Sequence, residues 1–532
     1  MAPPLQWVIM AHAQTARLRG AFTEYTYNGA KRMILVMSVI TIADPSFEVV
    51  GTTISVDKSK FIPPESRLKD LFHENLEIGP QVFDALCAAG THSEKDVFEL
   101  MKHKLRQFEN GINMSQDYHN LGESVKDYVS NYTLKVFRNT LARGHIDVAD
   151  MGTYLVVGRN VPRLVTLFLC SPHYLSHEQQ SLRYTKANSF HIPNALRGRP
   201  LEEKARALIT QAYSLYSRMV ERGIPLEDAR SILPLAVNSN ITSTGGGREY
   251  TYLGILSRSP HIVLPQVVKD SVDQILRSVS RIAPQVFLDY GPNYDIRRYY
   301  PSPQFFAKTN HFVNKLIAQN KGERVVLLGF HDNGLKLSKQ EVEEGVRSGD
   351  PAFFTNLLHI RAVFLVKLSL EAAHQAIRHR TWNHDFESLY DAAERFEYMV
   401  PPSIQSSDFL AEYHAMQSEM RELYMKVRDE VSRSESLLFL TNAHYVYDVM
   451  EIDGWNMIGN LPLRTCEKAQ WEIRGIAKLM TSRLAWGSAQ SGFTGDKTLS
   501  FYTLPTCQTF GVCYEDNSKD VCPIYRHKFL KA

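Results

Sequence analysis

The residues best suited to chemistry are two arginines at alternate positions, Arg378 and Arg380, with His379 between them. Ser388 follows after seven intervening residues, and the apolar stretch 362–377 comes directly before. Arginine is always charged and makes bidentate hydrogen bonds to phosphate or carboxylate groups. The pattern therefore favours a polyanionic ligand bound at the end of a buried element. The alternative is a solvated helix end, where basic side chains interact favourably with the helix dipole.

Polar and basic residues recur in the first half of the chain. Ser181 and Arg183 lie in the segment Ser-Leu-Arg-Tyr, and Arg230 lies in Ala-Arg-Ser-Ile-Leu-Pro. With an offset of 207 positions, Ser181 aligns with Ser388, and an Ile-Pro or Val-Pro pair follows each copy. This indicates one faint internal repeat. Its few identities leave chance alignment as the alternative.

These residues resemble the flavin-dependent thymidylate synthase family, whose signature is Arg-His-Arg, seven residues, Ser. The second half also carries Gln375 and a Leu-Arg pair ending at Arg464, followed by Ala-Gln-Trp-Glu-Ile at 469–473. The first-half segments at 181–184 and 229–234 resemble two other motifs of the family. The resemblance implies an enzyme that makes dTMP from dUMP. Methylenetetrahydrofolate would be the carbon donor, FAD the hydride carrier and NADPH the reductant.

Each half lacks the charged residues that the other half keeps. At the equivalent positions stand uncharged residues: Ser171 for Arg378, Tyr390 for Arg183, Leu437 for Arg230 and Ser257 for Arg464. The family resemblance implies a homotetrameric ancestor with nucleotide sites between subunits. A fused chain would then retain one composite site, and the equivalent second site, without its cations, is expected to be inactive. Random loss from both copies is the alternative, although it would not be expected to divide the residues so cleanly.

The resemblance also implies roles for the residues of the composite site. Ser181 and Arg183 would hold the phosphate of the nucleotide, with Arg230 at the phosphate or ribose. Gln375 belongs to the same set of substrate-binding residues. Arg464 would lie at the uracil carbonyl edge, where it favours charge developing there.

Flavin contacts are implied for Arg378, His379 and Arg380, which would meet flavin and nucleotide together. Arg378 and Arg464 are therefore the predicted catalytic residues, although no covalent nucleophile is assigned. Two further predicted flavin contacts are His145 and Arg248.

The chain departs from the family at several of these positions. Gln179 stands where the family usually has Glu, and Arg248 alone survives from a flavin-contacting Asn-x-Arg segment. Nucleotide binding is therefore better supported than FAD, and FAD better than thymidylate as product. The alternatives are a catalytically inactive nucleotide-binding or scaffold protein, or a flavoenzyme acting on another pyrimidine nucleotide.

Half of the six cysteines lie near the C-terminus, where Cys507, Cys513 and Cys522 precede His527. Four soft ligands of this kind could close a tetrahedral structural zinc site. The alternative is a set of unrelated thiols.

The secondary structure predicted around these residues indicates two α+β units. Strands are predicted at 33–43 and 324–329, and the stretch 148–170 is β-rich and then turns helical. Helices are predicted at 267–282, 364–380 and 413–431. We therefore predict helices packed on a mostly antiparallel sheet in each half. The predicted boundaries are 1–290, 291–500 and a tail at 501–532, and two chains would form a homodimer that mimics a tetramer.

Composition limits the class of protein. The 532 residues are 44% hydrophobic and 22% charged, with a formal net charge of +3, as in ordinary globular chains. Balanced charge does not predict a nucleic-acid partner. No apolar run approaches the roughly 20 residues of a membrane span, and no signal peptide is recognised. The few cysteines make a reducing cytoplasm the expected location.

Overall fold

The computed structural model describes residues 22–27, 30–35, 40–112, 118–320, 322–487, 497–511, 513 and 522. The chain divides into two compact units, residues 1–40 and 41–532. In the first unit, β1 (Phe22–Tyr27) and β2 (Ala30–Leu35) pair as an antiparallel hairpin. The strand predicted at 33–43 is therefore divided between β2 and the short strand β3 (Thr41–Ile42) of the second unit, which pairs with β7 (Ser189–Phe190).

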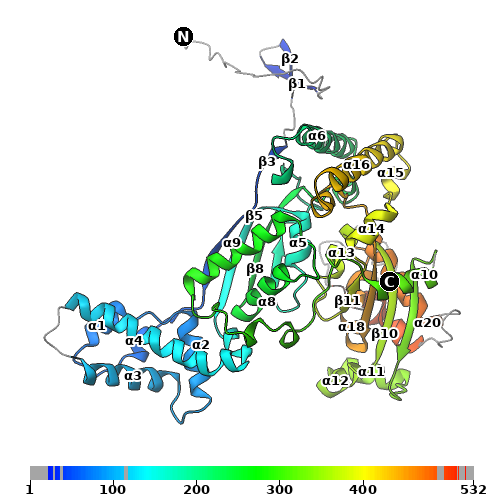
Figure 1. Cartoon of the computed structure of the whole chain (residues 1–532). Coiled ribbons are helices and arrows are strands. Elements are labelled where there is room, and N and C mark those ends of the chain that lie inside the picture. Colours follow the sequence, from blue (N-terminus) through cyan, green and yellow to red (C-terminus); the bar gives the residue numbers. More distant parts are fainter. Residues whose placement is uncertain are drawn as a thin grey trace. The chain divides into compact units, whose positions relative to one another are not determined.

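The first half of the second unit contains a four-stranded antiparallel sheet (Figure 1). Its strands lie in the order β4 (Ser46–Thr52), β5 (Thr153–Pro162), β8 (Asn238–Gly246) and β6 (Ser176–Gln179). Along β5, Tyr154 and Val156 are buried whereas Thr153 and Leu155 are exposed. This alternation marks one covered face, on which pack α5 (Arg163–Leu169), α8 (Gly247–Arg258) and α9 (Gln266–Ile282).

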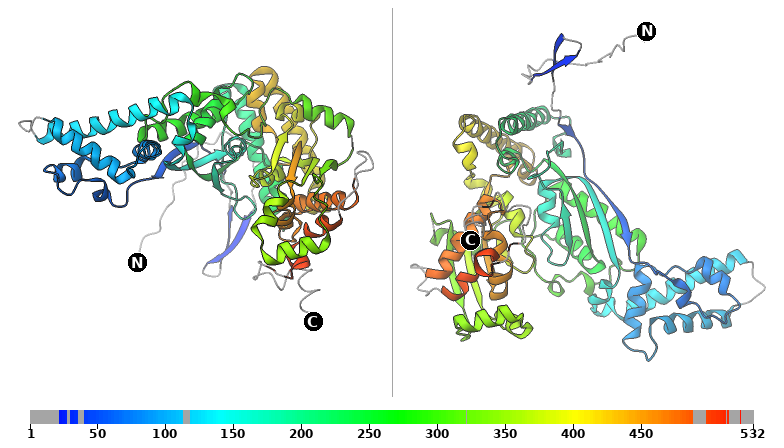
Figure 2. Two further views of the ribbon diagram at one scale, coloured as in Figure 1. Left: turned by 90° about the horizontal axis from the view of Figure 1, so that it is seen from below. Right: turned by 180° about the vertical axis from the view of Figure 1, so that it is seen from behind.

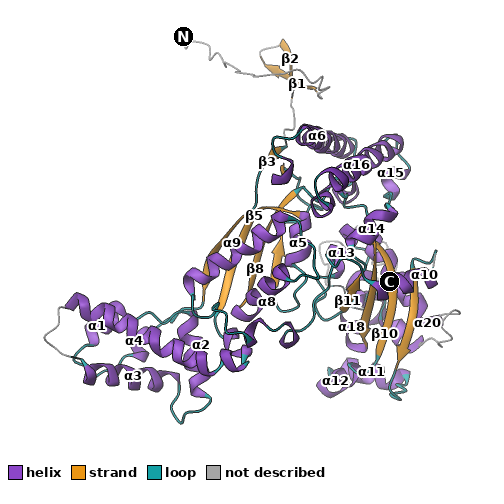
Figure 3. Ribbon diagram, in the orientation of Figure 1, coloured by secondary structure: helices purple, strands orange, loops and turns teal. Residues whose placement is uncertain are grey.

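The second half repeats this arrangement (Figure 3). Its antiparallel strands lie in the order β9 (Val325–His331), β10 (Arg361–Ser369), β12 (Tyr445–Asp453) and β11 (Asn383–Phe386). Packed on it are α10 (His311–Gln319), α13 (Leu370–Ala376) and α20 (Trp471–Trp486). Val313 of α10 joins a core cluster with Leu365 and Val449 of the sheet. The prediction of an α+β fold with antiparallel sheets is confirmed.

One prediction within this half is wrong. The stretch 364–380 was expected to be helical throughout, but residues up to Ser369 belong to β10, and only α13 is helical. The strand is buried on both faces, since α10 covers the side that solvent would otherwise reach. A short apolar run of this kind does not distinguish strand from helix by periodicity.

Equivalent elements of the halves recur at one offset. β8 begins at Asn238 and β12 at Tyr445, β6 at Ser176 and β11 at Asn383, each 207 positions later. This is the offset found in the sequence. Descent from a tandem duplication remains a prediction, and the common offset supports it.

The two halves meet through reciprocal backbone hydrogen bonds. The Leu235 N–H donates to the Leu440 carbonyl at 2.8 Å, and the Asn442 N–H donates to the Leu233 carbonyl at 3.0 Å. With the offset of 207, Leu235 is equivalent to Asn442 and Leu233 to Leu440, so each bond is the counterpart of the other. This is expected for a local two-fold relation. Beside them α6 (Pro200–Glu221) packs against α16 (Leu410–Glu430), and the two helices lie side by side both in Figure 1 and in the view from behind (Figure 2, right).

Four helices between β4 and β5 pack together, and the helical apolar spacing of the sequence at 97–101 and 128–136 falls within two of them. They are α1 (Lys69–Asn75), α2 (Pro80–Gly90), α3 (Val97–Gly111) and α4 (Tyr118–Asn139). Phe72, Met101, Leu105 and Val125 belong to their shared core. No helix in the described part of the chain is long and apolar enough to cross a membrane.

Short helices complete the fold around the sheets. The first half contributes α7 (Leu226–Ala229) and the second α11 (Lys339–Ser348), α12 (Pro351–Leu357), α14 (Leu389–Arg395), α15 (Pro402–Gln405), α17 (Arg433–Ser436), α18 (Gly454–Gly459) and α19 (Leu461–Thr465). Near the C-terminus lie α21 (Lys497–Tyr502) and α22 (Thr506–Thr509). The predicted tail is therefore partly helical where it is described.

Candidate functional site

Arginines from the two halves come together within one chain. Arg464 lies in α19, Arg378 follows α13, and Arg183 follows β6 of the first half. Burial, and then the nearby charges of Arg378 and Arg183, lower the pKa of Arg464 to about 10. Arg183 reaches across the halves, since its Nη2 donates to the carbonyl of Lys468 at 3.4 Å. Three of the predicted site arginines are thus assembled without a second chain.

Arg378 and Arg380 lie along the first-half segment that contains β6. Arg380 Nη1 donates to the Leu175 carbonyl at 3.2 Å and to Ser176 Oγ at 2.9 Å. Arg378 Nη2 donates to the His177 carbonyl at 3.4 Å. The side chain of Arg378 is 44% exposed, and its only described carboxylate neighbour is Glu178 at 3.6 Å, itself 89% exposed. The charge of Arg378 is therefore available to an anionic ligand.

The two predicted phosphate-binding arginines of the first half have carboxylate partners. Arg183 Nε donates to Glu227 Oε2 at 2.9 Å, and both side chains are partly exposed. Arg230 is buried, with its Nε 3.4 Å from Glu371 Oε2. Ser181 lies beside Arg183, whose backbone N–H donates to Ser181 Oγ at 3.3 Å. A phosphate at Arg183 would compete with an accessible carboxylate, whereas Arg230 is held inside the protein.

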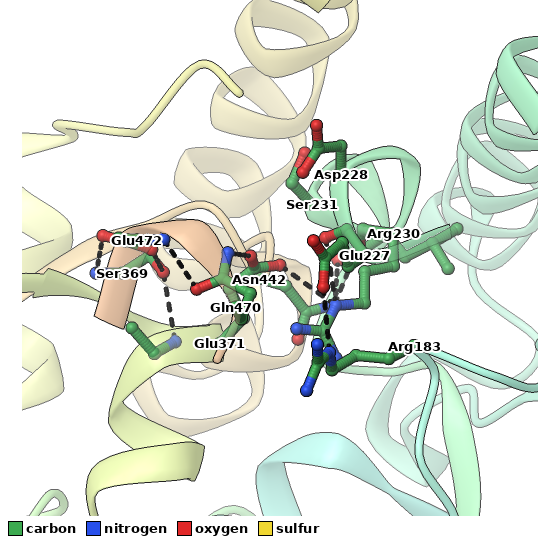
Figure 4. A network of polar contacts seen from close by, with 12 residues as sticks. Arg183, Glu227, Asp228, Arg230, Ser231, Ser369, Glu371, Asn442, Gln470 and Glu472 are labelled. Atoms are coloured by element: carbon green, nitrogen blue, oxygen red, sulfur yellow. Dashed lines mark hydrogen bonds and ion pairs between the residues drawn. The ribbon is translucent and has the colours of Figure 1, made fainter. Parts of the chain in front are cut away.

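The Arg230–Glu371 pair belongs to a polar network between the halves (Figure 4). Gln470 Nε2 donates to Glu371 Oε1 at 3.2 Å, and Asn442 Nδ2 donates to the Arg230 carbonyl at 3.3 Å. Burial raises the pKa of Glu371 to about 8, although Arg230 opposes the shift. Gln375, predicted to bind substrate, lies half-buried one helical turn away, where its Nε2 donates to the Glu371 carbonyl at 3.3 Å.

His379 holds Arg464 rather than facing outward. Its Nε2 accepts a hydrogen bond from Arg464 Nε at 2.6 Å, and the imidazole stacks on Trp382 with ring centroids 4.4 Å apart. Burial, and then the charge of Arg464, lower the pKa of His379 to about 3. The imidazole is therefore neutral at pH 7 and can accept this bond.

The two outlying flavin candidates lie in different surroundings. Arg248 Nη1 is 3.0 Å from Asp150 Oδ2, and its guanidinium carbon lies 5.8 Å from the ring centre of Tyr174, beside the segment that Arg380 contacts. His145 is exposed and lines a cavity of about 470 Å³ among the first-half helices. Among the described residues, no hydrogen bond or ion pair joins the His145 side chain to Arg378 or Arg380.

The site residues provide donors that fit an anionic dinucleotide such as FAD. Arg378 is exposed, and Arg248 and Arg380 extend the line of guanidinium groups along the first half. Arg230 Nη2 is buried and has no hydrogen-bond partner in the described part of the chain. Such donors suit a pyrophosphate or phosphate group.

The positions equivalent to the site residues by the offset of 207 form a second set, and the segment that connects the halves covers them. Ser388 Oγ donates to the Ala307 carbonyl at 2.5 Å, and the Leu389 N–H donates to the Phe305 carbonyl at 2.9 Å. The ring of Phe306 lies 6.0 Å from that of Phe168, which stands where the other side has Gln375. Inactivity of this second set remains a prediction, and this packing supports it.

The zinc prediction finds no support. Among the described residues, no group of three or more His, Cys, Asp or Glu side chains is arranged to hold a metal ion. That search includes Cys507, Cys513 and Cys522, which form no disulfide. His527 lies outside the described residues.

Sequence reasoning missed the carboxylates that accompany the arginines. Glu371 is a single acidic residue within the apolar stretch 362–377, a signal that favours a buried ion pair. Glu227 precedes Arg230 by three positions. Its pairing with Arg183 depends on contacts between distant segments and has no comparable signal.

Comparisons with known proteins agree with the resemblance. A family model described as thymidylate synthase complementing protein matches residues 86–285 and 341–485, more than half of the chain. Among curated proteins, the flavin-dependent thymidylate synthase of Sulfolobus acidocaldarius is 28% identical over 186 residues, 33% of this chain and 66% of that protein. The enzyme of the same name from Pyrococcus furiosus is 31% identical over 134 residues, 24% of this chain and 55% of that protein. The chain thus spans less than two thirds of the length of these relatives.

Among solved structures, a UMP/dUMP methylase, PolB, from Streptomyces cacaoi bound with 5-Br dUMP is similar at 15% identity. The match has a TM-score of 0.33 and covers 49% of this chain and 100% of that chain.

Proposed function

Because the chain belongs to the thymidylate synthase complementing protein family, we propose that it binds one uracil nucleotide between its two halves and methylates carbon C5. The substrate is dUMP or a related pyrimidine nucleotide, and methylenetetrahydrofolate donates the carbon. The observation that carries this proposal is the approach of Arg183 from one half to Arg378 and Arg464 from the other. A dianionic phosphate and an electron-rich ring both need cations at such a place.

Arg183 would hold the phosphate. Its guanidinium group is partly exposed and paired with Glu227, which is also accessible. A phosphate carries more negative charge than a carboxylate and offers more acceptor oxygens. Nucleotide binding would therefore displace Glu227 from Arg183, with Ser181 beside it as a further polar contact.

Arg464 would stabilise charge on the uracil carbonyl edge. Its Nε is committed to neutral His379, so its two terminal amino groups remain to face the ring. With a pKa of about 10, Arg464 keeps its proton at neutral pH. A cation already oriented for charge that develops in the transition state needs no reorganisation during the reaction.

Arg378, Arg380 and Arg248 would hold FAD through its phosphates. FAD, when bound, supplies the hydride chemistry, and NADPH is the reductant that the family implies. The chain itself supplies binding and orientation, and Arg378 is placed to contact nucleotide and cofactor together.

A second candidate function is nucleotide binding without methylation. Gln179 stands where the family usually has Glu, and its Nε2 donates to Thr166 Oγ1 at 3.0 Å and Ser239 Oγ at 3.1 Å. The amide is therefore committed to internal hydrogen bonds and carries no charge. This observation favours a chain that keeps the nucleotide site without the full chemistry.

The test starts from protein as purified. Its absorption spectrum is recorded, and the protein is then denatured so that any released cofactor can be identified. Titration with dUMP and with UMP follows, both by calorimetry and by the flavin spectrum. Flavin that responds to dUMP supports the enzyme, whereas nucleotide binding without flavin supports the second candidate. Binding of neither ligand would exclude both.

Self-association is proposed as well. Two chains would form a homodimer, which light scattering on the eluting protein measures. A monomeric mass would contradict the proposed dimer without affecting the nucleotide site.

A further inference from the structure

A series of aromatic rings in contact, here called the stack, starts at the acceptor of Arg464. His379 and Trp382 lie stacked with centroids 4.4 Å apart and planes at 16°. Trp382 and His384 are tilted, with centroids 6.2 Å apart and planes at 34°. His384 stacks on Phe386 at 5.6 Å and 16°. Phe386 stacks in turn on Phe305 of the connecting segment at 4.1 Å. The acceptor of Arg464 is therefore the first ring of a stack that ends between the halves.

The stack is buried and anchored to the sheet. Trp382 is 1% exposed and Phe386 is fully buried. His384 Nδ1 and Asp448 Oδ2 lie 2.6 Å apart, with both side chains almost completely inaccessible to water. Asp448 lies in β12, an inner strand, and its Oδ1 also accepts the Asp385 N–H at 3.1 Å. This pair fixes the plane of His384.

The upper end of the stack determines the direction of Arg464. The Nε–H must point along the lone pair of His379 Nε2, which lies in the plane of the imidazole. Trp382 lies nearly parallel to that imidazole and so limits its tilt. The orientation of the guanidinium group therefore depends on rings that do not touch it.

We propose that Trp382, His384 and Asp448 are positioning residues that orient Arg464 toward the nucleotide. They act through His379, and none of them is a residue type that the family signature specifies, since Trp382 and His384 stand among its seven unspecified residues. The inference rests on the proposed function in one respect, since it takes the nucleotide as the group that Arg464 meets. An oriented cation loses less side-chain entropy when the ligand binds.

Two variants weaken the stack without changing Arg464. Trp382→Leu removes the ring beneath His379, and Asp448→Asn removes the charge that holds His384. Each is expected to weaken dUMP binding roughly tenfold by calorimetry, since a mobile arginine must be ordered again. The matched control is Phe364→Leu, a core truncation in the neighbouring strand β10, which should leave the dissociation constant unchanged.

A double-mutant cycle separates positioning from general loss of stability. In an Arg464→Ala background, Trp382→Leu should change the dissociation constant by less than about twofold, because the arginine that it orients is gone. An equal effect of Trp382→Leu with and without Arg464 would overturn the proposal. So would a Phe364→Leu variant that loses as much affinity as the stack variants.

A measurement without substrate keeps this inference distinct from the proposed function. In protein labelled with ¹⁵N-arginine, the Nε–H of Arg464 should give a signal protected from exchange, assigned by its loss in Arg464→Lys. Trp382→Leu and Asp448→Asn should shift this signal and speed its exchange, whereas Phe364→Leu should not. An unshifted signal in both stack variants refutes positioning. Failure of wild-type protein to bind dUMP refutes the proposed function instead, and the NMR result still decides the role of the stack.

Discussion

Arg230 Nε and Glu371 Oε2 lie 3.4 Å apart where the two halves meet, and neither side chain is more than 6% exposed. Arg230 comes from the first half and Glu371 from the second. Removing one partner of a buried ion pair leaves an uncompensated charge in a medium of low polarity. The contact between the halves should therefore depend on both residues.

At pH 9, above the pKa of Glu371, Arg230→Met is expected to lower the free energy of unfolding by about 3 kcal/mol, since it leaves the ionised Glu371 without its main cation. Adding Glu371→Leu should recover much of this loss, because apolar side chains of similar size can replace a buried pair. Urea denaturation of the two variants measures both effects. A double variant less stable than Arg230→Met alone would contradict this account.

Glu371 should also make stability depend on pH. Its folded pKa is about 8, raised by burial from the ordinary value of 4.5. As the pH rises, the unfolded chain loses this proton first, so the contribution is complete below pH 4.5 and disappears as the pH passes about 8. The free energies of unfolding of the wild type and of Glu371→Gln should therefore diverge between pH 4.5 and about 8, with the wild type losing more stability as the pH rises. Parallel curves would show that Glu371 titrates normally.

Glu227 is expected to oppose the nucleotide. Glu227→Gln removes the carboxylate that competes for Arg183 and should strengthen dUMP binding about threefold, the scale of a partly exposed ion pair. Arg183→Ala should have the opposite effect and weaken binding at least tenfold, the scale of a hydrogen bond to a charged group. Calorimetry measures both. Weaker binding in Glu227→Gln would show that Glu227 contacts the nucleotide favourably.

One nucleotide should bind per chain. The second set of positions lacks cations and is covered around Phe305 and Phe306. Equilibrium dialysis with dUMP is expected to saturate at one per chain, and Arg464→Ala should weaken all of that binding. Arg433 is not one of these positions, but its guanidinium carbon lies 4.6 Å from the ring centre of Tyr390, which is. Arg433→Ala therefore serves as the control and should bind normally. Saturation at two nucleotides per chain would contradict the prediction.

Arg248 and His145 should differ in their effect on flavin. Arg248 lies beside Tyr174, next to the segment that Arg380 contacts, so Arg248→Ala should reduce the flavin that copurifies with the protein. His145→Ala should retain it, because His145 has no contact with these arginines among the described residues. Flavin content is read from absorbance after denaturation. The reverse order would place the cofactor near the first-half helices.

The sequence by itself determined which residue types the site contains and how the halves divide them. Arg183, Arg378 and Arg464 were identifiable because charged residues in fixed motifs keep their spacing while the surrounding chain diverges. The α9 helix and strand β9 followed from periodicity over lengths that packing does not override.

Tertiary structure decided how those residues are held. The pairing of Arg183 with Glu227, of Arg230 with Glu371 and of Arg464 with neutral His379 joins segments far apart in the chain. Residue order does not encode such distances, because they depend on how the two sheets and their helices meet. The same reason explains β10. Its apolar run suits a helix as well as a strand, and it is a strand because α10 packs on its second face.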